Sequence, residues 1–191
     1  MRLKYEKVIH RAIVNNLFGL GYTKKSCNAQ GSSKYYLFVT APFLCYNEFQ
    51  EDEVMIKEIV KDDFFLSQIA EKATKEDLYI GTDLKDTLQA HLHECVGMAG
   101  NMIGYNKAVI IFLEDEKMRV MYNPEIIKTS GNYHECEEGC LSHVGQKTVK
   151  RYDTIKVSYF DESFKKKIKT YSGFTAQIIQ HECDHLQGIL I

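Results

Sequence analysis

Residues 172–191 read SGFTAQIIQHECDHLQGILI, and this stretch decides how the rest of the chain is interpreted. Its apolar spacing predicts a helix from Gly173 to Leu186. Ser172 stands at the position of an N-cap, and Gly188 follows just past the expected end. Because the segments before it are strand-like, we expect this helix to pack on a sheet.

The predicted helix carries a candidate metal site in the run HECDH. Positions four apart lie on one face of a helix, so His181 and His185 can both present an imidazole to one ion. Phe174 and Ile178 fall on the same stripe, which predicts that the histidines point toward the core. Glu182 can reach a water on that ion without being a ligand. The alternative is a pair of core histidines without metal, which would be costly to bury beside carboxylates.

A third ligand is expected from upstream of the helix. In the extended motif HExxHxxGxxH it would lie downstream, but the position for that histidine is Ile191. The segment EEGCLS offers Cys140 between Gly139 and Leu141. A thiolate with two imidazoles leaves a fourth position open, which is typical of a catalytic site. Four other thiols are interpreted as buried or incidental: Cys27, Cys45, Cys136 and Cys183.

Composition and charge exclude several classes of function. The chain has 191 residues, 45% of them hydrophobic, and a net charge of −2, so a polyanion-binding protein is not expected. The basic run at 165–167 is interpreted as a solvated hairpin tip and not as a nucleic-acid patch. No apolar stretch approaches the roughly 20 residues of a membrane span, and the first residues lack a signal-peptide core. We therefore expect a cytoplasmic protein with no membrane partner, whose six cysteines are reduced thiols.

The pattern along the chain predicts an α+β fold, with short and mostly antiparallel strands packed around the C-terminal helix. Residues 107–114 and 118–127 form one predicted strand pair around the turn EDEK. Residues 155–161 and 166–172 form a second pair.

The first third of the chain has a different pattern. A helix is predicted at 3–18 and a strand at 35–40, followed by an acidic connector, and a new domain can begin at Met55. Thr74 and Asp77 have the spacing of a capping box. The helix that they introduce carries three leucines on one stripe: Leu84, Leu88 and Leu92.

Two intact motifs, EGCLS at 138–142 and HECDH at 181–185, together resemble the signature of the peptide deformylase family. In that family a glycine-rich GxGxAAxQ segment precedes EGCLS, and HExDH comes last. The resemblance covers residues 55–191 and implies a peptide deformylase-like metal hydrolase domain. Residues 1–54 match nothing in the family pattern and are expected to form an N-terminal extension of unknown role.

The resemblance implies a role for each residue of these motifs. Cys140, His181 and His185 would ligate one divalent metal, with ferrous iron (Fe2+) expected and zinc (Zn2+) or nickel (Ni2+) as alternatives. Glu182 would be the general base, and the backbone N–H of Leu141 would face the oxyanion. An ion pair would brace the cysteine loop, between Glu138 and Arg151.

The glycine-rich motif departs from the family pattern. The segment CVGMAGNM at 95–102 aligns on Gly97 and Ala99, which puts Met102 where the family has a glutamine. A thioether cannot donate the hydrogen bond that the amide gives to the oxyanion, and loss of one such donor typically costs on the order of 10²–10³ in rate. Asn101 is a neighbouring donor whose side chain is expected to point elsewhere, and simple core packing is the other interpretation of Met102.

The implied activity is removal of the formyl group from N-formylmethionyl nascent peptides, with release of formate. By analogy, the methionine side chain would occupy an apolar pocket lined by Val96, Phe174 and Ile178, with Gln177 as a polar neighbour. The extended peptide would pair with the segment near Gly97 as an added strand. Such a substrate implies transient proximity to the ribosome in a bacterial cytoplasm, and the sequence does not predict an oligomeric state.

Two alternatives remain open at this point. Met102 and the N-terminal segment favour a deformylase-like metal-binding protein with weak or no activity, acting as a binding or regulatory module. A general zinc peptidase is the other alternative, and the thiolate ligand and the missing downstream ligand count against it.

Overall fold

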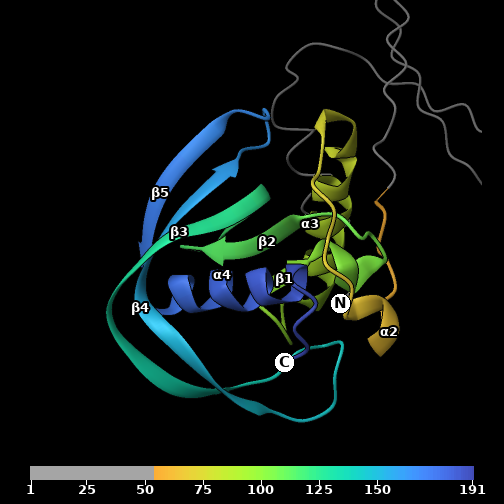
Figure 1. The fold of residues 1–191 in the computed structure, drawn as a ribbon. Coiled ribbons are helices and arrows are strands. Elements are labelled where there is room, and N and C mark those ends of the chain that lie inside the picture. The colour runs from red at the N-terminus through yellow and green to blue at the C-terminus, as the bar shows by residue number, and fades with distance from the viewer. Residues whose placement is uncertain (1–53) are drawn as a thin grey trace, which may run out of the picture. The chain divides into compact units, whose positions relative to one another are not determined.

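The structure is a computed structural model that describes residues 54–191 (Figure 1). The helix predicted at 3–18, the strand predicted at 35–40, and the thiols of Cys27 and Cys45 lie outside the described residues. None of the helices in the described part of the chain is both long and apolar enough to cross a membrane.

Five strands form one antiparallel sheet in the order β1-β2-β3-β4-β5. Both predicted strand pairs are confirmed, as β2 with β3 and β4 with β5. The turn between β2 and β3 places Asp115 and Glu116 at φ values of 48° and 62°, the left-handed conformation that two-residue hairpins require. The strands are β1 (Gly97–Ala99), β2 (Val109–Glu114), β3 (Lys117–Glu138), β4 (Lys147–Phe160) and β5 (Lys166–Ser172).

Strands β3 and β4 are longer than the sequence predicts, and they bend. The register between them shifts after Tyr122, after Ile126 and after Ser130. Such bulges bend a strand and increase its twist, and in Figure 1 both strands curve around the central helix α4 (Gly173–Leu186). The curve brings Glu138, the last residue of β3, to the side of that helix.

Helix α4 begins and ends where the sequence predicts. Ser172 precedes it, but its side chain makes no capping hydrogen bond, because Ser172 still belongs to β5 and pairs with Thr154. Gly188 ends the helix at a φ of 72°, and a Cβ there would lie 2.2 Å from the Ser67 carbonyl oxygen. Only glycine fits this C-terminal position.

The capping box at Thr74 and Asp77 forms as predicted, at the start of the short helix η1 (Lys75–Asp77). Helix α3 (Tyr79–His91) follows directly. Of the three leucines expected on one stripe of this helix, Leu84 and Leu88 are fully buried. Leu92 is 37% exposed and lies just past the end of α3. The other helices within residues 54–191 are α2 (Asp63–Leu66) and η2 (Gly100–Ile103).

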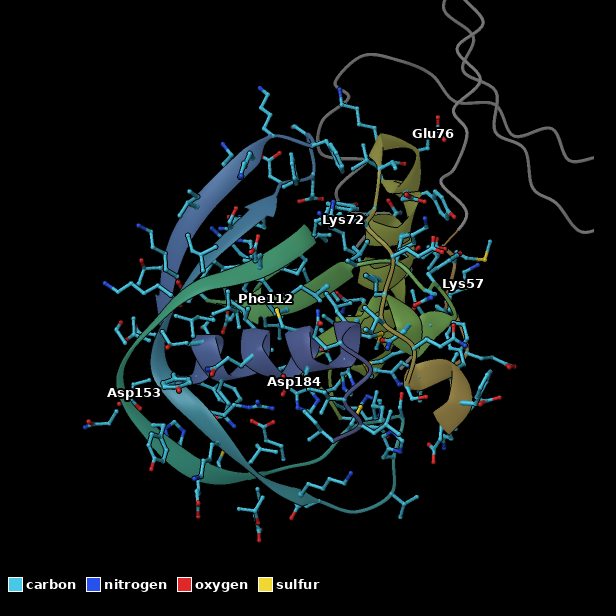
Figure 2. The ribbon with its side chains drawn as sticks, viewed as in Figure 1. Lys57, Lys72, Glu76, Phe112, Asp153 and Asp184 are labelled. Carbon is cyan, nitrogen blue, oxygen red and sulfur yellow. The ribbon has the colours of Figure 1, made fainter. Side chains whose placement is uncertain are left out.

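The hydrophobic core lies between the sheet and helices α3 and α4. Phe112 of β2 is fully buried there and meets Tyr171 of β5 edge to face at 5.8 Å. Figure 2 shows Phe112 beside α4 in the interior, whereas Lys72 and Glu76 lie at the periphery. The sheet and α4 are thus held rigidly against each other, which fixes any site between them.

Candidate metal centre

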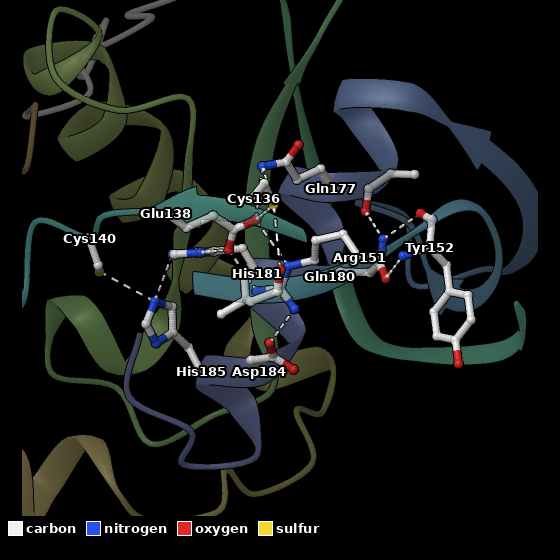
Figure 3. Close-up of polar contacts among 12 residues, drawn as sticks. Cys136, Glu138, Cys140, Arg151, Tyr152, Gln177, Gln180, His181, Asp184 and His185 are labelled. Atoms are coloured by element: carbon white, nitrogen blue, oxygen red, sulfur yellow. Dashed lines mark hydrogen bonds and ion pairs between the residues drawn. The ribbon is translucent and has the colours of Figure 1, made fainter. Parts of the chain in front are cut away.

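The three predicted metal ligands come together at one point (Figure 3). His181 and His185 lie one turn apart on α4, and their Nε2 atoms are 3.1 Å apart. Cys140 follows β3 in a loop, and its Sγ lies 3.3 Å from His185 Nε2. The three ligand atoms all lie within 4.8 Å of one another.

The loop turns the Cys140 sulfur toward the histidines. The backbone N–H of Ser142 donates to Cys140 Sγ at 3.4 Å, and the N–H of His143 donates to the Cys140 carbonyl at 3.3 Å. Gly139 lets the chain pass close to a neighbouring loop segment, because a Cβ there would lie 3.3 Å from the Gly145 carbonyl oxygen. The turn after Gly139 therefore positions the thiol.

Glu138 anchors the first histidine. Its Oε2 accepts a hydrogen bond from His181 Nδ1 at 2.8 Å. Arg151 donates a hydrogen bond to each carboxylate oxygen, from Nε to Oε1 at 3.0 Å and from Nη2 to Oε2 at 2.7 Å. A carboxylate on Nδ1 leaves the Nε2 lone pair of His181 free for a metal.

Asp184 extends the network of Glu138, Arg151 and His181, and it is not among the residues predicted from the sequence. Its Oδ2 accepts from Arg151 Nη1 at 2.7 Å, so Arg151 joins β4 to both β3 and α4. The signal was available, because Asp184 is the fourth residue of the HECDH motif itself.

Burial alone would raise the pKa of Glu138, but the hydrogen bonds from His181 and Arg151 outweigh it and hold that pKa well below its usual value. Glu138 therefore stays ionised and ready to orient the ring.

The histidine pair lacks a satisfactory set of hydrogen bonds without a cation. His185 Nε2 faces both His181 Nε2 and the Cys140 sulfur, although one ring nitrogen can serve only one of them as donor or acceptor. Burial and the charge of His181 lower the pKa of His185 to about 3. A divalent ion would accept all three lone pairs at once, so the residues fit a metal.

Glu182 lies beside this centre in a buried setting. Its side chain is 3% exposed, and Oε2 has no hydrogen-bond partner among the described residues. Burial raises the pKa of Glu182 to about 7. A Cβ on Gly97 of β1 would lie 2.6 Å from Glu182 Oε1, so the backbone of β1 is pressed against this carboxylate.

Met102 packs in the core, and its neighbour does not replace the missing amide. Met102 is 2% exposed, and its sulfur accepts from the Ala99 N–H at 3.4 Å. The amide of Asn101 donates to the His185 carbonyl at 2.8 Å, so it points elsewhere as predicted. The backbone N–H of Leu141, by contrast, has no acceptor within residues 54–191.

The predicted pocket residues divide into two groups. Gly97 and Ile178 are buried against each other, and Val96 is half-buried beside them in the chain. Phe174 differs from the expectation, because it is 64% exposed. Burial along α4 begins only at Ala176, so the first turn of the helix extends beyond the core.

A cysteine sulfur and two imidazoles around one point, with a buried carboxylate beside them whose Oε2 has no hydrogen-bond partner within residues 54–191, define the class of protein. This donor set leaves one coordination position open, which is the arrangement of a catalytic metal centre. The fold and the site together are those of a metal-dependent hydrolase.

Comparison with known proteins identifies the family. The family model for polypeptide deformylase matches residues 56–191. A peptide deformylase from Clostridium beijerinckii is 52% identical over 137 residues, which are 72% of this chain and 100% of that protein. One from Picosynechococcus is 38% identical over 135 residues, covering 67% of this chain and 72% of that protein. The chain belongs to the polypeptide deformylase family.

Solved structures agree with this assignment. The actinonin-bound class I type b peptide deformylase from Acinetobacter baumannii superposes with a TM-score of 0.65 at 31% identity, covering 71% of this chain and 95% of that one. A peptide deformylase from Legionella pneumophila gives a TM-score of 0.64 at 33% identity, covering 71% and 83%. The α+β fold expected from the sequence is therefore confirmed.

Proposed function

We propose that this protein removes the formyl group from N-formylmethionyl peptides of nascent proteins and releases formate. The observation that carries the proposal is the convergence of Cys140, His181 and His185 beside the buried carboxylate of Glu182. It lies within the part of the chain that matches the family.

The metal would be held by Cys140 Sγ and by the Nε2 atoms of His181 and His185. Ferrous iron is the expected ion, with zinc or nickel as alternatives. When bound, the ion supplies Lewis-acid activation of water and of the formyl oxygen.

The chain's own residues supply the proton transfers. Glu182 takes a proton from the attacking water and passes it to the leaving amine nitrogen as the C–N bond breaks. The free N–H of Leu141 donates to the oxygen that gains negative charge.

Strand β1 is proposed to bind the peptide. It is one of the two edge strands of the sheet, so one side of its backbone has no strand partner among the described residues and could pair with an extended chain. Val96 and Ile178 would contact the methionine side chain, with Gly97 at the centre of the pairing. Phe174 would contribute only at the exposed rim.

The alternative of a weakened, metal-binding relative rests on Met102. Turnover of formyl-Met-Ala-Ser by iron-loaded protein, prepared without oxygen and followed by formate release, tests it. Met102→Gln should raise kcat about tenfold or more, because the glutamine oxygen can accept from the Ala99 N–H and leave the amide free to donate. Absence of turnover in both proteins would overturn the deformylase proposal.

Residues 55–191 are proposed to form the hydrolase domain, with residues 1–54 as an extension. The substrate places the protein in the cytoplasm of a bacterium, in transient proximity to the ribosome.

A further inference from the structure

Gln177 lies one turn before His181 in α4 and is half-buried. Its Nε2 donates to Glu138 Oε1 at 2.9 Å and lies 3.4 Å from Cys136 Sγ (Figure 3). The side chain that the sequence suggested as a polar pocket lining thus contacts the carboxylate that orients a proposed metal ligand.

The Glu138 carboxylate uses its full capacity as an acceptor. Oε1 accepts from Arg151 Nε at 3.0 Å and from Gln177 at 2.9 Å. Oε2 accepts from Arg151 Nη2 at 2.7 Å and from His181 at 2.8 Å. Because a carboxylate offers about four lone-pair sites, each donor fills one of them. The thiol of Cys136 adds a longer contact to Oε1 at 3.6 Å, so that Cys136 is not incidental.

Gln177 and His181 hold opposite oxygens of this carboxylate from one rigid helix. Rotation of the carboxylate plane would lengthen one contact or the other. Arg151 cannot replace the amide, because its remaining nitrogen is bound to Asp184 at 2.7 Å. The amide therefore acts together with the two Arg151 contacts to fix the plane of Glu138, and that plane sets the direction in which His181 Nε2 points.

We infer that Gln177 is a positioning residue for the metal centre, acting through Glu138 on His181. This inference rests on the proposed metal site and deepens it. Direct partners of metal ligands typically change metal affinity or activity 10–100-fold when removed, so a residue one contact further away should matter by about 3–10-fold.

The test uses the full chain loaded with Co²⁺, whose bond to a thiolate absorbs light. The rate of Co²⁺ transfer to a chelator is measured for the wild type, Gln177→Met and Gln177→Glu. We expect Gln177→Met to release Co²⁺ about 3–10-fold faster, and Gln177→Glu faster still because a second carboxylate would face Glu138. With formyl-Met-Ala-Ser, kcat should fall and KM should stay the same.

Gln180→Met is the matched control. Gln180 lies on the same helix and is buried, but its amide binds the backbone N–H and carbonyl of Tyr152, each at 3.0 Å, and touches none of the ligands or Glu138. The Gln180→Met variant should have a lower free energy of unfolding in urea and the same rate of Co²⁺ release as the wild type. The positioning role of Gln177 would be overturned if Gln177→Met released Co²⁺ at the wild-type rate, or if Gln180→Met released it as fast as Gln177→Met. Either result would leave the proposed metal site itself intact. Failure of the wild type to take up Co²⁺ would overturn the metal site itself, and this inference with it.

Discussion

Glu182 is the residue on which the proposed chemistry depends. It is buried, its Oε2 has no hydrogen-bond partner in the part of the chain that the structure describes, and it adjoins the proposed ligands without being one of them. Glu182→Gln keeps its shape but cannot take a proton. We expect turnover to fall by about 10²–10⁴, the usual contribution of a general base, while metal content stays the same. Formate release measures the turnover, and elemental analysis of the same sample measures the metal content. Retained turnover in Glu182→Gln would contradict the role of Glu182 as general base.

The same carboxylate predicts a pH dependence of stability in the metal-free protein. Burial raises its pKa in the folded state to about 7, from an ordinary value of 4.5. Between these values the folded protein keeps a proton that the unfolded chain has lost, so stability falls as pH rises through this window. The loss is at most roughly 3 kcal/mol.

Urea unfolding of metal-free wild type and Glu182→Gln measures this effect. The wild type should lose stability relative to the variant as the pH is raised from about 4.5 to about 7, because glutamine does not titrate. A stability difference that is constant across this window would show that Glu182 is not forced to ionise in a buried setting.

At the scale of residues, the sequence predicts those whose type and spacing carry the chemistry. Cys140, His181, His185 and Glu182 could be assigned from two short motifs. The Glu138–Arg151 pair was also expected, but the contact of Gln177 with Glu138 was not, because Gln177 meets Glu138 only after β3 curves back onto α4. The local pattern contains no information about that closure.

Strand β1 and helix α4 meet at the proposed general base, Glu182. A Cβ at Gly97 would lie 2.6 Å from both Glu182 Oε1 and Ile178 Cγ2. Gly97→Ala should therefore displace Glu182 and lower kcat, and the overpacking should cost about 1–3 kcal/mol of stability. Formate release and urea unfolding check this, and an unchanged kcat would mean that β1 does not position the base.

Arg151 joins β3, β4 and α4 through a buried ion pair with Glu138 and a half-buried one with Asp184. Arg151→Met leaves Glu138 buried without its charge partner, which should cost about 3–5 kcal/mol in urea unfolding. Arg119→Met is the control, because Arg119 is 52% exposed in its pair with Glu114 and should cost below about 1 kcal/mol. Similar losses in the two variants would contradict the bracing role.

At the scale of elements, hairpins and helix ends were predictable, but strand length was not. Gly188 marks the end of α4, and the EDEK turn marks the end of β2, because each position needs a particular backbone conformation that the local residues indicate. The outer half of β3 is mostly exposed and polar, and its three register shifts break the alternation that reveals a strand. Its path depends on pairing with β4, which local sequence does not reveal.

At the scale of the whole molecule, the hydrolase domain should fold without residues 1–54. A peptide deformylase is matched along its entire length by 72% of this chain. The start of the domain is anchored internally, because Lys57 N–H donates to Thr87 Oγ1 at 3.0 Å. We expect a protein of residues 55–191 to unfold cooperatively and to turn over formyl-Met-Ala-Ser within about threefold of the full chain. An unfolded or inactive fragment would show that the first 54 residues complete the domain.

In the proposed metal centre, one ion joins the loop after β3 to helix α4. Anomalous diffraction at the absorption edge of the bound metal, from crystals of anaerobically prepared protein, tests it most directly. We predict a single peak bonded to Cys140 Sγ and to the Nε2 atoms of His181 and His185. A peak elsewhere, or no peak between these three atoms in metal-loaded crystals, would contradict the account.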